Sequence, residues 1–223
     1  MSEHIYDLDC KGYKIIQDKL GYAFTTDSVL LANFIKLKHS DEAVELCSGS
    51  GVISVLVYAK QGPKNIFGVE IEKRLCDMAD RTSRLNNLEG KVDFVNISLQ
   101  EAPSYFKREF SAVFCNPPYN KNNQKNLSAE VAAARHEVKM TLEELAVSAS
   151  KLLKFGGKFF LIHRADRIDE IFLMLMKYNI NPKILQFVQP TKEKDPHLVM
   201  IEAVKGSKHG VRVLKPIIVD EMQ

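Results

Sequence analysis

The 223-residue sequence predicts an α/β fold: a mostly parallel seven-stranded sheet with an antiparallel hairpin at one edge and helices on both faces. Two observations predict it. Short apolar runs alternate along the chain with segments of helical period, which is the pattern of strand–helix–strand units. The last two apolar runs, 183–189 and 197–205, have no helical segment between them, so we expect them to pair as the hairpin.

The expected elements follow in order along what we interpret as one domain, 1–223. The N-terminal segment, 1–40, is expected to be helical, with a clear helix at 27–38. Strands are expected at 43–47, 65–69, 92–95, 110–115, 158–163, 183–189 and 197–205. Further helices are expected at 52–60, 72–87, 141–154 and 166–178. Thr141 and Glu144 have the spacing of a capping box, and Gly156 and Gly157 are expected to end that helix.

The motif Asn116-Pro117-Pro118-Tyr119 directly follows the apolar run 110–115. In an open parallel sheet, ligands bind at the carboxyl ends of the strands, which is where this motif falls. The prolines stiffen the backbone and lack an N–H, so their carbonyls and the Asn116 side-chain oxygen are available as acceptors. Tyr119 offers a ring on which a base stacks. The motif predicts an enzyme that holds a planar substrate with an amino group; an exposed turn is the alternative.

A glycine-rich turn at 48–51 (Ser-Gly-Ser-Gly) joins the expected strand 43–47 to the expected helix 52–60. Strand, glycine turn and helix form the nucleotide-binding arrangement, because glycines let the backbone approach a ligand closely. Glu70 ends the next strand, 19 residues after Gly51. This is close to the spacing of about 20 residues expected of an acid that binds ribose hydroxyls.

Two better-known nucleotide motifs are excluded. Ser54 stands where the third glycine of a dinucleotide fingerprint would fall, and no Lys-Ser or Lys-Thr pair follows the turn, as a P-loop requires. Glu45, in the strand before the turn, suits a cationic ligand better than a pyrophosphate. S-adenosylmethionine, which carries a sulfonium and an amino group, fits this arrangement; an ordinary glycine turn is the alternative.

Together these segments resemble the class I S-adenosylmethionine-dependent methyltransferases that modify exocyclic amino groups, which have a Rossmann-like fold. The segments 21–31 (GYAFTTDSVLL), 134–137 (ARHE) and 152–157 (LLKFGG) narrow the resemblance to the bacterial family that methylates N6 of adenine 37 in a valine tRNA. The similarity runs from about residue 12 to about residue 219. Asn-Pro-Pro-Tyr is shared with DNA adenine, RNA guanine and protein glutamine methyltransferases, so it indicates the reaction better than the substrate.

The resemblance implies roles for the residues that match the family's motifs. The catalytic residues would be Asn116, Pro117, Pro118 and Tyr119. The cofactor would be bound by Thr26, Asp27, Glu45, Ser48, Gly49, Gly51, Glu70, Ser98 and Asn116. The RNA would contact Tyr119, Lys121, Lys125, Arg135, His136, Arg164 and Arg167. Two positions depart from the family's pattern: Cys47 stands at the usual first glycine of the turn, and Ser98 where an aspartate is usual. We therefore expect a modest affinity for the cofactor.

Charge is distributed unevenly along the chain. Between Lys151 and Lys215 there are 13 basic and six acidic residues, whereas the whole chain has a net charge of +3, so the basic surplus lies in the C-terminal part, 151–223. Such asymmetry suits contacts to RNA phosphates, and a solvated basic face is the alternative. The polar segment 120–136 is interpreted as a substrate flap beside the base pocket.

Composition limits the class of protein. Apolar residues make up 45% of the chain, no apolar run reaches the length of about 18 residues that a membrane span needs, and residues 1–4 carry no apolar signal core. The four cysteines form neither a Cys-x-x-Cys pair nor a metal-ligand spacing. We therefore expect a cytoplasmic protein with reduced cysteines, no membrane association and no metal. The oligomeric state is not indicated.

The expected reaction is a direct methyl transfer. Asn116 and the Pro117 carbonyl would bind the amino group of adenine 37, and Tyr119 would stack on the base once it is turned out of the anticodon loop. Three alternatives remain: another nucleic acid as substrate (rRNA guanine or DNA adenine), a protein glutamine, or a non-catalytic module that binds the cofactor and RNA. No separate target-recognition domain is evident, which disfavours a sequence-specific DNA enzyme.

Overall fold

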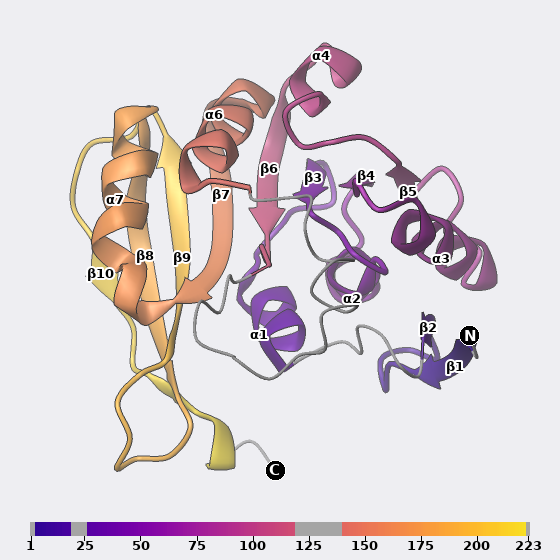
Figure 1. Ribbon diagram of the computed structural model, residues 1–223, viewed down its shortest axis with the longest axis horizontal. Coiled ribbons are helices and arrows are strands. Elements are labelled where there is room, and N and C mark those ends of the chain that lie inside the picture. The colour runs from indigo at the N-terminus through magenta and orange to yellow at the C-terminus, as the bar shows by residue number, and fades with distance from the viewer. Residues whose placement is uncertain (1–2, 19–25, 119–139, 222–223) are drawn as a thin grey trace, which may run out of the picture.

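The computed structural model describes residues 3–18, 26–118 and 140–221 (Figure 1). Tyr119 and the expected flap at 120–136 lie outside the described residues. Four other residues expected to contact RNA also lie outside the described residues: Lys121, Lys125, Arg135 and His136. Their predicted roles stay predictions.

A single large sheet lies at the centre of the fold. Its strands are β3 (Glu42–Leu46), β4 (Asn65–Val69), β5 (Val92–Val95), β6 (Phe110–Cys115), β7 (Leu153–Arg164), β8 (Ile180–Gln189), β9 (Leu198–Lys205), β10 (Arg212–Val213) and β11 (Ile217–Ile218). Their order is β10-β8-β9-β7-β6-β3-β4-β5, with β11 also paired to β8. Only β9, which lies between β7 and β8, pairs antiparallel with its neighbours. The predicted mostly parallel α/β sheet and its antiparallel hairpin are confirmed, and β10 and β11 extend the edge beyond that hairpin.

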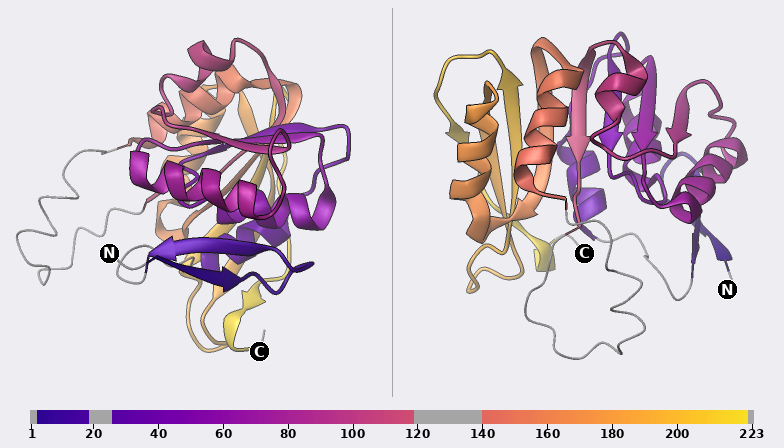
Figure 2. Two further views of the ribbon diagram at one scale, coloured as in Figure 1. Left: turned by 90° about the vertical axis from the view of Figure 1, so that its right-hand side faces the viewer. Right: turned by 45° about the horizontal axis from the view of Figure 1, so that its top comes forward.

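Helices cover both faces of the sheet, as Figure 2 shows. They are α1 (Thr26–Phe34), α2 (Val52–Gln61), α3 (Lys73–Leu85), α4 (Ala102–Phe106), α6 (Leu142–Leu152) and α7 (Ile168–Lys177), with single turns η1 (Ala165–Arg167) and η2 (Val219–Glu221). The core has two layers because side chains alternate along each strand. Val113 and Cys115 of β6 pack toward α6 and α7, whereas Ala112 and Phe114 pack toward α1 and α2. No helix within the described ranges is long and apolar enough to span a membrane.

The expected helical segment 1–40 is wrong for its first half. Among the described residues of this segment only α1 is helical, while β1 (Glu3–Asp7) and β2 (Lys14–Asp18) form an antiparallel pair. This pair is docked on α3: the Lys14 N–H donates to Asn86 Oδ1 (2.8 Å) and the Ile16 N–H donates to Thr82 Oγ1 (3.1 Å). These partners are 72 and 66 residues away in the chain, so no local pattern indicated them.

The end of α6 also differs from the expectation. The helix stops at Leu152, and Gly156 and Gly157 lie inside β7 instead of ending the helix. Lys205 explains the earlier end, because its ammonium donates to the carbonyls of Ser150 (2.7 Å) and Leu153 (2.6 Å). A basic side chain from β9 thus satisfies carbonyls that a glycine cap would otherwise satisfy.

The predicted capping box at the start of α6 is confirmed and can be tested. Thr141 Oγ1 accepts from the Glu144 N–H (3.1 Å), and Glu144 Oε2 accepts from the Thr141 N–H (2.8 Å). We expect Thr141→Ala to lower the free energy of unfolding by about 1 kcal/mol, measured by urea denaturation. Ser104→Ala, an exposed serine of α4, is the control and should change it by less than about 0.5 kcal/mol. Equal effects of the two substitutions would contradict a stabilising cap.

Candidate functional site

The glycine turn and the Asn-Pro-Pro motif lie at the ends of neighbouring strands. β3 pairs in parallel with β6, with Leu46 opposite Cys115. The turn begins directly after β3, and Asn116 directly after β6. Both strands end at the lower edge of the sheet in Figure 1, which we call the carboxyl edge. Two segments some 65 residues apart in the sequence are therefore brought to one place, at the strand ends where the sequence predicted each of them.

The two glycines of the turn have different roles. Both have positive φ, +55° at Gly49 and +83° at Gly51. A Cβ at Gly49 would meet no atom within 4 Å, whereas a Cβ at Gly51 would lie 2.5 Å from the ring of Phe94. Gly49 therefore leaves space above the turn for a ligand, and Gly51 is required by packing. Ser48 Oγ is buried without a hydrogen-bond partner among the described residues, as fits a group that awaits a ligand.

Glu70 is held against this turn. Its Oε2 accepts from the Gly49 N–H (2.8 Å), and its Oε1 accepts from the Glu72 N–H (2.8 Å). Burial raises the pKa of the carboxyl, although these bonds oppose the rise. Asn96 supports the loop after β4 by donating to the carbonyls of Glu70 (2.8 Å) and Ile71 (2.9 Å). Each carboxylate oxygen can accept more than one hydrogen bond, so Glu70 can also receive ribose hydroxyls.

Glu45 has a different environment from the one that the sequence suggested. Its Oε2 accepts from both the N–H (3.0 Å) and the hydroxyl of Ser54. Burial raises the pKa of Glu45 to about 8, so the neutral form predominates at pH 7. The side chain thus links β3 to the first turn of α2, a partnership that sequence reasoning missed. The expected contact of Glu45 with a cationic ligand stays a prediction.

Asn116 is positioned by α1. Its Nδ2 donates to Oγ of Ser28, a buried residue in the first turn of α1, at 3.3 Å. This bond orients the amide, with Oδ1 as its acceptor atom. Pro117 is buried and Pro118 is exposed. Sequence reasoning missed Ser28, although it follows Asp27 within the segment 21–31 that carries the family resemblance.

Ser98 follows β5, so that Ser48, Glu70 and Ser98 come after three adjacent strands. The Ser98 N–H and hydroxyl both donate to Glu101 Oε2, at 2.8 and 2.7 Å. Because the hydroxyl gives its only hydrogen to Glu101, it can act toward a ligand as an acceptor. This is the role expected of Ser98 toward an adenine amino group.

Sulfur atoms gather behind the turn. Cys47 has a φ of +58°, in the left-handed region that favours glycine. Its Sγ lies 3.7 Å from Sδ of Met140, and it contacts buried Cys115, whose thiol pKa is raised by burial. Within the described ranges, no three His, Cys, Asp or Glu side chains are grouped so that they could hold a metal ion.

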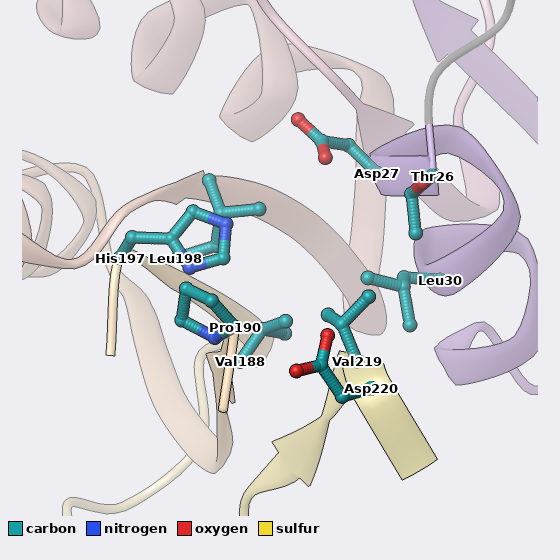
Figure 3. A pocket seen from close by; sticks show the side chains of 9 residues that line it. All are labelled: Thr26, Asp27, Leu30, Val188, Pro190, His197, Leu198, Val219 and Asp220. Atoms are coloured by element: carbon teal, nitrogen blue, oxygen red, sulfur yellow. The ribbon is translucent and has the colours of Figure 1, made fainter. Parts of the chain in front are cut away.

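A cavity of about 230 Å³ lies at the same edge, on the side of α1 that faces the β8–β9 turn (Figure 3). It is lined by Thr26, Asp27, Leu30, Val188, Pro190, His197, Leu198, Val219 and Asp220. In Figure 3 the carboxylates of Asp27 and Asp220 lie on different sides of the opening. The cavity is smaller than most ligand pockets, at roughly 300–1,000 Å³, so it can hold at most part of a nucleotide-sized ligand. Thr26 and Asp27 face this cavity, and their expected contact with the cofactor stays a prediction.

Arg164 and Arg167 also reach the carboxyl edge, but acidic neighbours neutralise both. Arg164 Nε donates to Asp166 Oδ1 (3.0 Å), and Arg167 Nη2 donates to Glu170 Oε2 (2.5 Å). RNA phosphates would have to compete with these ion pairs. The RNA contacts of the two arginines stay predictions.

The raised pKa of Glu45 predicts a pH-dependent stability. The folded protein holds a proton on Glu45 up to about pH 8, whereas the unfolded chain loses it near pH 4.5, so stability falls as the pH rises between these values. Glu45→Gln keeps the acceptor and cannot ionise. We expect the free energy of unfolding of the variant, relative to that of the wild type, to rise by a few kcal/mol as the pH increases from 5 to 8. The measurement is urea denaturation at a series of pH values.

A control of opposite sign is available in Glu101. Hydrogen bonds from Ser98 lower the pKa of this carboxyl, so its charge is favoured in the folded state. The free energy of unfolding of the wild type should therefore rise relative to that of Glu101→Gln as the pH increases through the ordinary carboxyl range. Parallel pH profiles for wild type and Glu45→Gln would refute the buried-acid assignment.

Curated relatives cover most of the chain. A protein of Vibrio vulnificus strain YJ016 is 23% identical over 199 residues, covering 86% of this chain and 80% of its own length. A Flavobacterium psychrophilum protein is 23% identical over 198 residues, covering 87% and 85%. Both carry the name tRNA1(Val) (adenine(37)-N6)-methyltransferase.

Solved structures share the fold. A protein of Agrobacterium tumefaciens described as a predicted O-methyltransferase superposes with a TM-score of 0.70 at 19% identity, over 86% of this chain and 87% of its own. TrmN from Thermus thermophilus superposes with a TM-score of 0.57 at 14% identity, over 80% of this chain and 48% of its own. The fold is thus that of the class I methyltransferases.

The methyltransferase small domain profile matches residues 24–175, which include the glycine turn, Glu70 and Asn116. This range exceeds half of the chain. The chain therefore belongs to the methyltransferase small domain family.

Proposed function

We propose that this chain transfers a methyl group from S-adenosylmethionine to N6 of adenine 37 in a valine tRNA. The observation that carries the proposal is the pairing of β3 with β6, which brings the glycine turn and Asn116-Pro117-Pro118 together. The relatives named for this activity match 86–87% of the chain, which supports the choice of substrate. A cytoplasmic location fits a tRNA substrate and stays a prediction.

The residues at the carboxyl edge fit the cofactor. The space above Gly49 admits a ligand, and the hydroxyl of the preceding residue, Ser48, is buried against Gly68 without a hydrogen-bond partner among the described residues. Glu70 would hold the ribose hydroxyls, and Ser98 would accept from the adenine amino group of the cofactor. S-adenosylmethionine supplies, when bound, an electrophilic methyl group on a cationic sulfur.

Asn116 and Pro117 would prepare the amino group of the substrate. An amino nitrogen on an adenine ring is a weak nucleophile, because its lone pair is delocalised into the ring. Asn116 Oδ1 and the Pro117 carbonyl would each accept one of its hydrogens, which draws the nitrogen out of planarity and localises the lone pair. Ser28 would act through Asn116 by fixing its amide, so Ser28 is a positioning residue. Orientation of this kind lowers the barrier without a covalent intermediate.

Two other substrate classes are less well supported. A protein glutamine or a DNA adenine would use the same acceptors, because both carry an amino group. The curated relatives described above are named for a tRNA substrate over most of the chain's length. A non-catalytic module would not need the Ser28 bond that orients Asn116.

Asn116→Ala tests the reaction. We expect it to lower kcat for methyl transfer to total bacterial tRNA by about 100-fold or more, because the acceptor that activates the nucleophile is lost. The measurement is incorporation of labelled methyl with nucleoside analysis for N6-methyladenosine. Ser28→Ala should lower kcat less, since it removes only the orientation. Retained cofactor binding in both variants guards against misfolding, and undiminished turnover by Asn116→Ala would refute the assigned role.

Glu70→Ala tests the cofactor site. Losing hydrogen bonds to a charged group should weaken S-adenosylmethionine binding roughly ten-fold or more, measured by titration calorimetry. Glu72→Ala is the matched control, because Glu72 is an exposed neighbour whose carboxylate pairs with Arg74 (3.9 Å). Equal affinities for wild type and Glu70→Ala would remove Glu70 from the site.

A further inference from the structure

The basic surplus of the C-terminal part gathers away from the candidate site. The turns at the amino ends of the strands in this half of the sheet are 107–109, 150–156, 177–183 and 204–212. Together they contain nine lysines and arginines and a single acid, Glu109. Except for Arg212, which begins β10 and lies opposite Ile184 in the middle of β8, they lie toward the upper edge of the sheet in Figure 1, opposite the carboxyl edge. Charge alone would therefore draw a polyanion to the edge that lacks the reactive groups.

The two edges of the sheet also differ in how many of their basic residues form ion pairs. At the carboxyl edge, Arg164, Arg167 and Lys192 are held by acids, whereas Lys194 has no acidic partner among the described residues. At the opposite edge, Arg108, Lys177 and Lys205 are also paired with acids, but six cations have no acidic partner among the described residues: Lys107, Lys151, Lys154, Lys183, Lys208 and Arg212. Lys154 donates only to the hydroxyl of Ser111 (2.9 Å), and Lys183 only to the carbonyl of Lys208 (3.1 Å). Neutral partners position these ammonium groups without cancelling their charge.

An exposed aromatic ring lies in the same part of the chain as two of these cations, Lys154 and Lys208. Phe155, next to Lys154 at the start of β7, is 75% exposed. Its ring rests on the backbone of Gly206, where a Cβ would come within 2.0 Å of a ring carbon. Glycine is therefore required beneath the ring, which leaves the other face of the ring open to solvent. The surface continues from Gly206 to Lys208 and, through the bond to its carbonyl, to Lys183.

We propose that this surface, the amino-edge platform (Phe155, Lys151, Lys154, Lys183, Lys208 and Arg212), binds the RNA substrate at a point remote from the reacting base. An exposed aromatic ring and unneutralised cations on one face of a protein can stack an unpaired base and contact its phosphates. A membrane surface would need a broader apolar face than one ring. The inference rests on the proposed RNA substrate.

The strand length sets the distance between the platform and the site. Phe155 and Arg164 mark opposite ends of β7, nine residues apart, which corresponds to about 30 Å of extended chain. An RNA that occupies both places must therefore extend well past the methylated loop. A whole tRNA meets this condition better than an excised anticodon stem-loop. The platform would add affinity and leave the chemical step unchanged.

Binding of unmodified full-length tRNA at a series of salt concentrations tests the proposal. Phe155→Ala should weaken binding about five-fold or more through lost stacking. For the double variant Lys154→Gln/Lys208→Gln, the slope of log K against log salt concentration should become shallower by about 1.5, as expected for two lost phosphate contacts. Leu173→Ala, an exposed leucine of α7, and Lys91→Gln, before β5, are the matched controls and should bind like wild type. Unchanged circular dichroism and thermal midpoints would show that the variants fold.

Steady-state methylation separates the platform from the proposed function. With full-length tRNA the platform variants should raise KM and keep kcat, and with an anticodon stem-loop both constants should match wild type. Methylation with unchanged tRNA binding and KM in every variant would overturn the platform and leave the function standing. Platform-dependent tRNA binding without any methyl transfer would overturn the function and leave the platform standing. Loss of binding to phosphatidylglycerol vesicles, with tRNA binding intact, would overturn the assignment to RNA.

Discussion

The parallel pairing of β3 with β6 is the constraint on which the rest of the site depends. Ala43 to Leu46 lie opposite Ala112 to Cys115, and these residues are buried on both faces of the sheet. Neighbouring strands lie about 4.8 Å apart, so the segments that leave them start side by side. The glycine turn and Asn116 need no long-range contact of their own to meet. Their proximity follows from backbone hydrogen bonds that the buried sheet protects from water.

Carboxylates then shape the loops that leave these strands. Glu70 accepts from the N–H groups of Gly49 and Glu72, and Glu101 accepts from the N–H of Ser98. Glu45 does the same for Ser54, but deep enough in the core that its pKa rises to about 8. The carboxylates of this site thus accept hydrogen bonds from the protein's own backbone N–H groups. Exposure decides which of them also stays charged and able to receive a ligand.

The distribution of neutralised and unneutralised cations suggests a division of labour. At the carboxyl edge the described arginines are held by Asp166 and Glu170, so electrostatic attraction there is weak. At the opposite edge the cations of the amino-edge platform have neutral partners or none among the described residues. Affinity for a polyanion and recognition of a single base would then reside on different edges of one sheet. Under this proposal, the base would be selected at one edge while phosphate contacts at the other supply the binding energy.

The sequence by itself determined the fold class, the seven central strands, the capping box at Thr141 and the position of the glycine turn and of Asn116 at the carboxyl ends of strands. Each depends on local periodicity or on the rule that parallel strands end at one edge, and both can be read along the chain. Tertiary structure alone decided the docking of β1 and β2 on α3, the early end of α6 under Lys205, and the bonds Ser28–Asn116 and Ser54–Glu45. It also decided which basic residues keep their charge unneutralised. These features depend on partners that are mostly distant in the sequence and on burial, neither of which a local pattern contains.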